Sequence, residues 1–293
     1  MKRWLRRIAA FVVLLGAVVA PRETRAANLV PNGSFESITS CPTSFGQLYL
    51  AAPWDVPTAG TSDVYNVCVT GWPPLPVPGV PLSPFGYQPA RTGVGCAGII
   101  VKSAYPDYRE YLQVPLTSPL VSGNTYLVKF YVSLGDTCDS ALDRLGAYLS
   151  VGPVGPLFTW PPLPYTPQVE SPAATFLTDT LNWTLVSGTF VAAGGESHLV
   201  IGNFHDDAST TIVPTGNSWP GAYYFVDDVS VELQLPTEQA CCTSDGQCSM
   251  QFPGECLLLG GSPAGAGTTC GTNPCGATPT KRTSWGALKT IYR

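Results

Sequence analysis

The stretch Tyr126-Leu-Val-Lys-Phe-Tyr-Val-Ser-Leu134 decides the fold class of this chain. Its even-numbered positions hold Tyr, Val, Phe, Val and Leu, whereas Lys129 and Ser133 lie on the other phase. A period of two is typical of a β-strand with one buried face. Similar runs occur at 110–114, 145–151, 183–191, 198–204 and 222–233. Because no continuous helical periodicity accompanies them, the sequence predicts an all-β protein with strands spaced as in a two-sheet sandwich.

The composition favours many short strands joined by turns, because the 293 residues include 30 Gly and 29 Pro. The chain holds 15 basic residues, but six of them lie within the first 25 positions. Between positions 27 and 280 the basic residues are Arg91, Lys102, Arg109, Lys129 and Arg144. So few cations cannot neutralise a run of phosphates, which argues against nucleic acid as a partner.

Residues 1–26 have the layout of a secretory signal peptide. A basic start precedes an apolar run at 8–20, and small residues at Thr24 and Ala26 suit cleavage before Ala27. The run is shorter than the ~20 residues that span a bilayer, so an uncleaved membrane anchor is the alternative. No later stretch approaches that length. We therefore expect a secreted or cell-surface protein.

Export changes the interpretation of the ten cysteines, because thiols outside the cytoplasm tend to pair and an even number leaves none over. Four are widely spaced, and we expect Cys41 to pair with Cys68 and Cys96 with Cys138, since these pairs close local loops. The other six lie close together: Cys241, Cys242, Cys248, Cys256, Cys270 and Cys275. They predict a small stapled module, in which fifteen pairings remain open. Zinc is the competing interpretation, but the module has no Cys-x-x-Cys knuckle and no nearby His.

These signals divide the chain into a signal peptide at 1–26, a β domain at 27–235, a six-cysteine module at 236–276 and a basic tail at 277–293. Within the β domain, the Pro-rich stretches 72–89 and 152–172 are expected to be loops at the ends of the sandwich. In the tail, apolar residues recur at helical spacing, from Trp285 through Leu288 to Ile291. A docking or surface-retention signal is one interpretation, and a frayed end is the other.

Two segments that bracket the strand-rich region suggest a family. They are Asn28-Leu-Val-Pro-Asn-Gly-Ser-Phe-Glu36 and Phe225-Val-Asp-Asp-Val-Ser-Val-Glu232. Together with Arg109-Glu-Tyr-Leu-Gln113, they resemble the galactose-binding-like jelly-roll domain, of the carbohydrate-binding-module kind, on secreted bacterial surface proteins. The resemblance covers about 205 residues and implies a jelly-roll β-sandwich. The stretch that begins at Ala240-Cys-Cys is similar to short repeats that follow other domains in exported bacterial proteins.

The resemblance also implies a structural calcium site. In a jelly roll the terminal strands lie side by side, which would bring Glu36 near Asp227 and Asp228, and carboxylate oxygens are the ligands that calcium prefers. Val226 and Val229 fall on opposite phases of the strand pattern, so we expect a β-bulge that turns a carboxylate inward. The alternative is that these acids are solvated at a sheet edge.

Tryptophans in the loops are candidates for carbohydrate binding, because flat apolar sugar faces stack on exposed aromatic rings. Trp54, Trp72, Trp160 and Trp219 lie in loop-like, Pro-rich surroundings, whereas Trp183 lies within a strand pattern and is expected in the core. The resemblance, rather than the spacing, favours binding. Taken singly, each of these rings is more consistent with a plug that packs its own loop.

The sequence offers few candidate catalytic residues. Hydrolysis of a glycosidic bond needs two carboxylates on opposite sides of it, but neighbours in a strand, such as Asp227 and Asp228 or Asp206 and Asp207, point to opposite faces. Glu110 is a further carboxylate, and the two histidines, His198 and His205, show no catalytic spacing.

We therefore expect a secreted, non-catalytic glycan-binding protein whose partner is a polysaccharide or a cell-surface glycan. A structural cell-surface or extracellular matrix protein is the alternative, and a glycoside hydrolase comes third.

Overall fold

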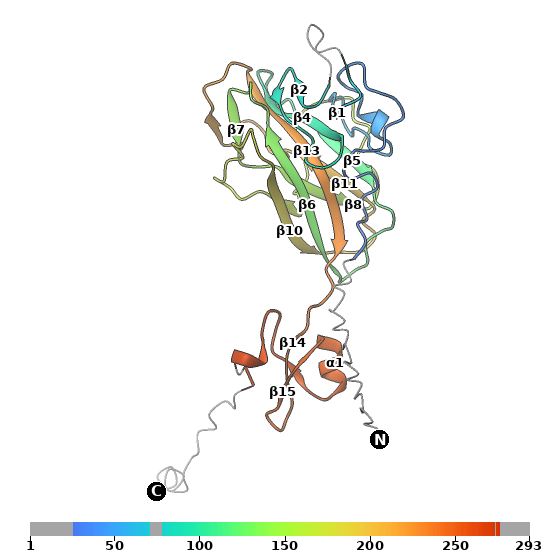
Figure 1. The fold of residues 1–293 in the computed structure, drawn as a ribbon, viewed down its shortest axis with the longest axis vertical. Helices are drawn as coiled ribbons and strands as arrows, with labels where there is room; N and C mark the ends of the chain where they lie inside the picture. Colours follow the sequence, from blue (N-terminus) through green and yellow to red (C-terminus); the bar gives the residue numbers. More distant parts are fainter. Residues whose placement is uncertain (1–25, 71–77, 273, 276–293) are drawn as a thin grey trace, which may run out of the picture.

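Two antiparallel sheets form the main domain of the computed structural model, which describes residues 26–70, 78–272 and 274–275 (Figure 1). The first sheet has the order β1 (Asp63–Asn66), β4 (Gly95–Ser103), β13 (Gly221–Leu233), β6 (Thr125–Leu134) and β10 (Thr184–Val191). The second has the order β5 (Tyr111–Pro115), β11 (His198–Gly202), β8 (Gly146–Ser150) and β9 (Val169–Glu170).

The order in which the chain visits the sheets makes this sandwich a jelly roll. Strands β4, β6, β10 and β13 lie in the first sheet, and β5, β8, β9 and β11 lie in the second. The last strand of the sandwich, β13, is inserted between β4 and β6, and β11 is inserted between β5 and β8. This is the double Greek-key arrangement of eight strands in two sheets. The predicted fold class, an all-β jelly roll, is therefore confirmed.

Shorter elements complete the structure. Around the sandwich they are η1 (Leu48–Ala51), β2 (Leu82–Ser83), β3 (Gly86–Tyr87), β7 (Ser140–Leu142) and β12 (Ile212–Pro214). The cysteine-rich module contains β14 (Gln239–Cys242), β15 (Cys248–Gln251), α1 (Pro253–Leu258), β16 (Ser262–Pro263) and η2 (Cys270–Thr272). Its strands form a small sheet of their own, in the order β15-β14-β16.

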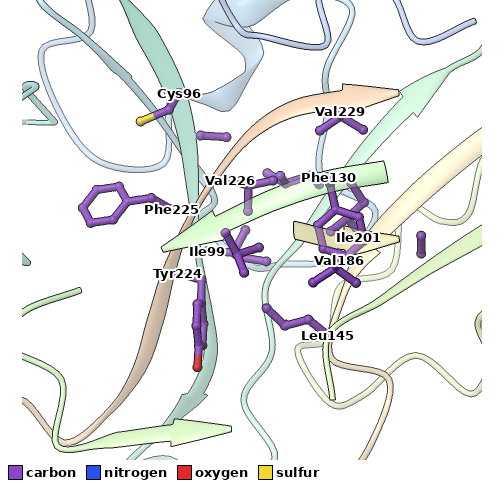
Figure 2. Packing of buried hydrophobic residues seen from close by; sticks show 14 of the residues in the cluster. Cys96, Ile99, Phe130, Leu145, Val186, Ile201, Tyr224, Phe225, Val226 and Val229 are labelled. Atoms are coloured by element: carbon purple, nitrogen blue, oxygen red, sulfur yellow. The ribbon is translucent and has the colours of Figure 1, made fainter. Parts of the chain in front are cut away.

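The core lies between the two sheets, where Ile99, Phe130 and Val226 of the first sheet approach Ile201 of the second (Figure 2). Burial alternates along β6 but is nearly continuous along β4. Both faces of β4 are therefore shielded from water over most of its length. Each fully buried aliphatic side chain contributes about 1.5–3 kcal/mol.

A β-bulge interrupts β13, as predicted. The register with β6 shifts between Asp227 and Ser230, and Asp228 has a left-handed backbone, with φ of 48°. The N-terminal segment lies beside this bulge, where the Val229 N–H donates to the Gly33 carbonyl at 2.8 Å. A Cβ on Gly33 would lie 2.2 Å from the Val229 carbonyl oxygen, so this close approach requires glycine. The two segments that carry the family resemblance are therefore neighbours.

The Pro-rich segment 152–167 covers the outer face of the four-stranded sheet. A second hydrophobic cluster lies beneath it, consisting of Tyr111, Val154, Leu163, Val200 and Phe204. The Val154 N–H donates to Gln113 Oε1 at 2.7 Å, and the Leu163 N–H donates to the Tyr111 hydroxyl at 2.9 Å. Side chains and backbone of this segment therefore occupy the face that the sheet turns away from the core.

Disulfides staple both parts of the chain. The pairs are Cys41–Cys68, Cys241–Cys256, Cys242–Cys275 and Cys248–Cys270. The first is the pair expected from the sequence, and the last three select one of the fifteen pairings that the module allowed.

The predicted bond between Cys96 and Cys138 is wrong, because both thiols are free and buried. Cys138 Sγ accepts the N–H of Tyr223 at 3.2 Å, and Tyr223 pairs with Ile100 on β4. Ile100 lies four residues from Cys96 along that strand, or about 13 Å. A disulfide needs Cα atoms within about 7 Å.

The predicted signal peptide and basic tail lie outside the described residues, apart from Ala26. Within the described part of the chain, no helix has the length and apolar character to span a bilayer.

Candidate functional site

Aromatic side chains surround a hollow of about 310 Å³ at one end of the sandwich. Tyr105 and Tyr108, from the loop between β4 and β5, line it together with Trp219, which precedes β13. Ile100 and Ser103 of β4, with Ala104 and Pro220, complete the lining. We call this set the aromatic hollow. Tyr105 is 74% exposed, so its ring is available to a ligand from solvent.

The Pro-rich segment brings a fourth ring to the same place. Trp160 is 50% exposed, and its ring centroid lies 6.4 Å from that of Tyr108. Its position is fixed through the backbone, because the Arg109 N–H donates to the Trp160 carbonyl at 2.8 Å. Two of the four tryptophans predicted to bind carbohydrate, Trp160 and Trp219, are thus brought together around Tyr108.

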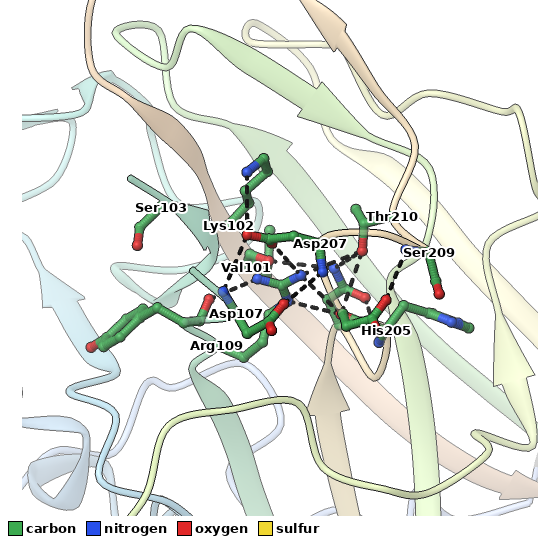
Figure 3. A network of polar contacts seen from close by, with 12 residues as sticks. Val101, Lys102, Ser103, Asp107, Arg109, His205, Asp207, Ser209 and Thr210 are labelled. Carbon is green, nitrogen blue, oxygen red and sulfur yellow. Dashed lines mark hydrogen bonds and ion pairs between the residues drawn. The ribbon is translucent and has the colours of Figure 1, made fainter. Parts of the chain in front are cut away.

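A buried arginine holds the loop that carries the two tyrosines (Figure 3). Arg109 is fully buried, and its guanidinium donates to Asp207 Oδ1 at 2.8 Å and to the carbonyls of Tyr108 and His205, each at 2.9 Å. The backbone N–H groups of Asp107 and Asp207 each donate to the other residue's carboxylate, at 3.1 and 2.8 Å. These contacts tie the β4–β5 loop to the connection that follows β11.

The charge of Asp207 follows from these neighbours. Burial alone would raise the pKa of Asp207, but the Asp107 N–H and the Arg109 guanidinium outweigh it and hold the pKa below its ordinary value. Lys102 Nζ lies 3.7 Å from the same carboxylate. Asp207 is therefore ionised at neutral pH and serves as the anchor of the loop.

Glu110, which the sequence offered as a carboxylate for hydrolysis, is committed to the structure. It is buried, and its oxygens accept the Tyr108 hydroxyl and the backbone N–H groups of Thr61 and Ile100, at 2.8 to 2.9 Å. Burial and the charge of Glu110 raise the pKa of Tyr108, so that its hydroxyl stays protonated and donates. Glu110 thus orients the Tyr108 ring beside the hollow.

The remaining predicted tryptophans lie elsewhere. The prediction that Trp54 binds carbohydrate is wrong, because its side chain is 2% exposed. Its ring packs at a tilt against Phe35, with ring centroids 4.7 Å apart, and its Nε1–H donates to the Asn32 carbonyl at 2.9 Å. It fills the space beneath the N-terminal segment. Trp72 lies outside the described residues. Trp183, expected in the core, is partly buried against it.

The three predicted metal ligands hold a loop. Glu36 accepts the N–H groups of Val94 and Gly95, at 2.9 and 3.0 Å, and Asp227 accepts those of Arg91 and Thr92, at 2.8 and 3.2 Å. Asp228 contacts the Arg91 guanidinium and accepts the Thr92 hydroxyl at 2.7 Å. We call Glu36, Asp227 and Asp228, with the segment 91–95 that they bind, the carboxylate clasp.

The carboxylate clasp does not fit a calcium ion. Calcium takes six to eight oxygen ligands, whereas these oxygens face N–H donors and a guanidinium, which would repel a cation. Among the described residues, no group of three or more acidic, His or Cys side chains is placed to hold a metal. The terminal segments are instead joined by hydrogen bonds and by the charge of Arg91.

The histidines do not join the aromatic hollow. His205 Nε2 lies 2.7 Å from Glu170 Oε1, and His198 Nδ1 lies 3.0 Å from the Ser197 hydroxyl at the other end of β11.

Sequence reasoning missed Tyr105 and Tyr108. The available signal was their place shortly before the strand that begins at Tyr111.

Among the comparisons with known proteins, the one with solved structures finds proteins of similar shape. No protein-family model matches the sequence, and a search of curated proteins finds no match. Solved structures that are similar include TmCBM61 in complex with β-1,4-galactotriose, at 15% identity over 71% of this chain and 100% of that chain, with a TM-score of 0.33. The CBM22-1 xylan-binding domain from Paenibacillus barcinonensis Xyn10C has 17% identity over 71% and 96% of the chains, with a TM-score of 0.34.

The K3 cleaved adhesin domain of Lys-gingipain from Porphyromonas gingivalis has 14% identity over 70% and 98% of the chains, with a TM-score of 0.35. At these scores the comparison assigns neither a family nor a ligand to this chain.

Proposed function

We propose that this chain is a secreted, non-catalytic glycan-binding protein and that the aromatic hollow, together with Trp160, is its binding site. The convergence of Tyr105, Tyr108, Trp160 and Trp219 on one end of the sandwich carries the proposal. Exposed rings supply flat apolar surfaces for the apolar faces of sugars. The hollow, at about 310 Å³, lies at the lower end of the ~300–1,000 Å³ range of small-molecule sites.

Hydrogen bonds hold the residues beneath the aromatic hollow in place, which favours a preformed binding site over a loose surface loop. The bonds of Arg109 and Glu110 fix the backbone and one ring before a ligand arrives. A preorganised site loses less side-chain entropy on binding. The exposed ring of Tyr105 and the half-exposed ring of Trp160 then form the outer wall.

Secretion is part of the same proposal. Four disulfides among the described residues are typical of proteins that fold in an oxidising compartment. The apolar run at 8–20 would supply the export signal.

A glycan array tests the function, using the chain from Ala27 to Arg293 with its disulfides formed. The panel includes β-1,4-galactan, xylan and cellulose oligosaccharides, and hits are titrated by intrinsic tryptophan fluorescence. Trp160→Ala and Tyr105→Ala should each weaken binding roughly threefold to tenfold, the value of one stacked ring.

Phe158→Ala is the matched control, because Phe158 is 90% exposed in the same segment, whereas Trp160 is the residue of that segment whose ring lies against Tyr108. It should leave the affinity for the glycan unchanged. Absence of binding across the panel would refute the function. If all three variants bound with the affinity of the wild type, the proposed site would be refuted.

A further inference from the structure

Large apolar side chains remain exposed on the cysteine-rich module. α1 and the residues on either side of it carry Phe252, Leu257, Leu258 and Leu259, which are 42%, 64%, 89% and 61% exposed. They lie within eight consecutive residues. We call these four side chains the leucine ridge. Exposed apolar side chains that are scattered singly are ordinary, whereas a group of them close together marks a surface that binds something.

A disulfide fixes which side of α1 faces the module. Cys256 is the buried residue of α1, and it is bonded to Cys241 of β14. The turn after the helix packs on the same bond, because a Cβ on Gly261 would lie 2.6 Å from Cys241 Sγ. The leucine ridge therefore points away from the interior of its own module.

The tail at 277–293 carries apolar residues that match such a surface. Trp285, Leu288 and Ile291 recur at every third position, so they would share one face of a helix. An isolated helix of this length is marginal in water and is stabilised chiefly by packing its apolar face. The pattern therefore indicates a segment that needs a surface to pack against.

Charge favours the module as that surface. The tail has no acidic side chain and four basic ones, Lys281, Arg282, Lys289 and Arg293. The module at 236–276 has three acidic residues and no Lys, Arg or His. One of the three, Glu255, is exposed in the first turn of α1, three residues before Leu258 and on the same side of the helix. An apolar segment flanked by cations thus complements an apolar ridge flanked by a carboxylate.

The tether between the module and the tail is long enough for this contact. Cys275 is bonded to Cys242 with 5.1 Å between their Cα atoms, and the neighbouring Cys241 is bonded to Cys256 with 5.5 Å. Since the step between the two neighbours adds ~3.8 Å, the Cα atoms of Cys275 and Cys256 lie within about 15 Å of each other. The ten residues from Cys275 to Trp285 extend to ~33 Å. So short a tether gives the tail a local concentration in the millimolar range.

We propose that the leucine ridge is the docking surface for the tail of the same molecule, which packs Trp285, Leu288 and Ile291 against it. A second copy of the chain has no tether to favour it, and an anionic lipid surface would repel the acidic module. The contact gives the cysteine-rich module a role of its own. It is independent of the glycan proposed for the sandwich.

Hydrogen–deuterium exchange of the chain from Ala27 to Arg293, read by mass spectrometry, tests this docking. Amides at 285–292 should exchange at least ~tenfold more slowly than in an unstructured peptide. Leu258→Ser should remove that protection, because Leu258 is 89% exposed and its loss costs the module no packing of its own. Leu181→Ser is the matched control, since Leu181 is 78% exposed between β9 and β10, and it should leave the tail protected. Release of two thiols on denaturation would show that each variant formed its disulfides.

A carbodiimide cross-link between Lys289 and Glu255 gives a second readout, and Glu255→Gln should abolish it. In an equal mixture of ¹⁴N- and ¹⁵N-labelled protein, each linked pair of peptides should carry a single label. Mixed labels would assign the leucine ridge to a second copy. Protection of the tail that appears only with phosphatidylglycerol vesicles would assign the tail to lipid. Either result would overturn the proposal, and so would a tail that exchanges freely in the wild type.

Discussion

Replacing Asp227 by asparagine should change how stability depends on pH. The Asp227 side chain is fully buried. Burial and the neighbouring charge of Asp228 raise the pKa of Asp227 to about 7. Hydrogen bonds from the N–H groups of Asp228, Thr92 and Arg91 lower this pKa but do not outweigh the burial. A raised pKa means that the folded protein favours the protonated acid. The stabilisation is therefore complete below the unfolded value of 3.8 and is lost as pH rises through about 7.

The magnitude follows from the size of the shift. A difference of about three pKa units between folded and unfolded states corresponds to ~4 kcal/mol. The side-chain amide in Asp227→Asn does not titrate, so the pH-independent cost of placing its NH₂ group against N–H donors cancels when two pH values are compared. The free energy of unfolding of wild type minus that of Asp227→Asn should fall by ~4 kcal/mol between pH 4 and pH 8.

Urea denaturation at intervals from pH 4 to pH 8 measures this difference. Asp206→Asn is the control, because Asp206 is exposed and hydrogen bonds from Ser209 lower its pKa, so its difference from wild type should be flat above about pH 5. A flat difference for Asp227→Asn as well would refute the reasoning. It would show that the three N–H donors keep the buried carboxylate ionised throughout.

Three further outcomes follow from the same contacts. Arg109→Met should cost about 3 kcal/mol in urea denaturation, because it strands a partly exposed carboxylate and two carbonyls, whereas Lys102→Met should cost under about 1 kcal/mol. Cys96 and Cys138 should not react with Ellman's reagent in the folded protein, since burial raises the pKa of both thiols; denaturation without reductant should release two thiols. A chelator should leave the melting temperature unchanged, because N–H donors and a guanidinium occupy the carboxylate clasp, and a drop would restore the calcium prediction.

Strand positions were predictable where one face of a strand remains partly accessible. The alternating run at 126–134 became β6 with an alternating burial pattern. β4, at Gly95–Ser103, was missed because both of its faces are covered, and a strand covered on both faces shows no period-two pattern. Its sequence also contains two glycines, including Gly98, where a Cβ would lie 1.9 Å from the Tyr223 hydroxyl.

The carboxylate clasp shows how far residue types alone can lead. The acids at Glu36, Asp227 and Asp228 indicated that the terminal segments meet at a bulge, and the structure places them there. Their partner could not be inferred, since most of the donors in 91–95 are backbone N–H groups, which every non-proline residue has. Carboxylates that bind a cation and carboxylates that bind a loop have the same appearance in a sequence.

Whether a tryptophan is buried or exposed depends on the path of its loop and not on its neighbours in the sequence. Trp54 follows a proline and Trp160 precedes two, yet Trp54 is buried under the N-terminal segment and Trp160 is half-exposed. The difference arises because segment 152–167 crosses the four-stranded sheet and is held there by Gln113 and Tyr111. By filling that face, the segment closes the sheet to ligands and carries Trp160 to the rings of the aromatic hollow. The same covering therefore accounts both for the occupied outer face of this sheet and for the position of the proposed site.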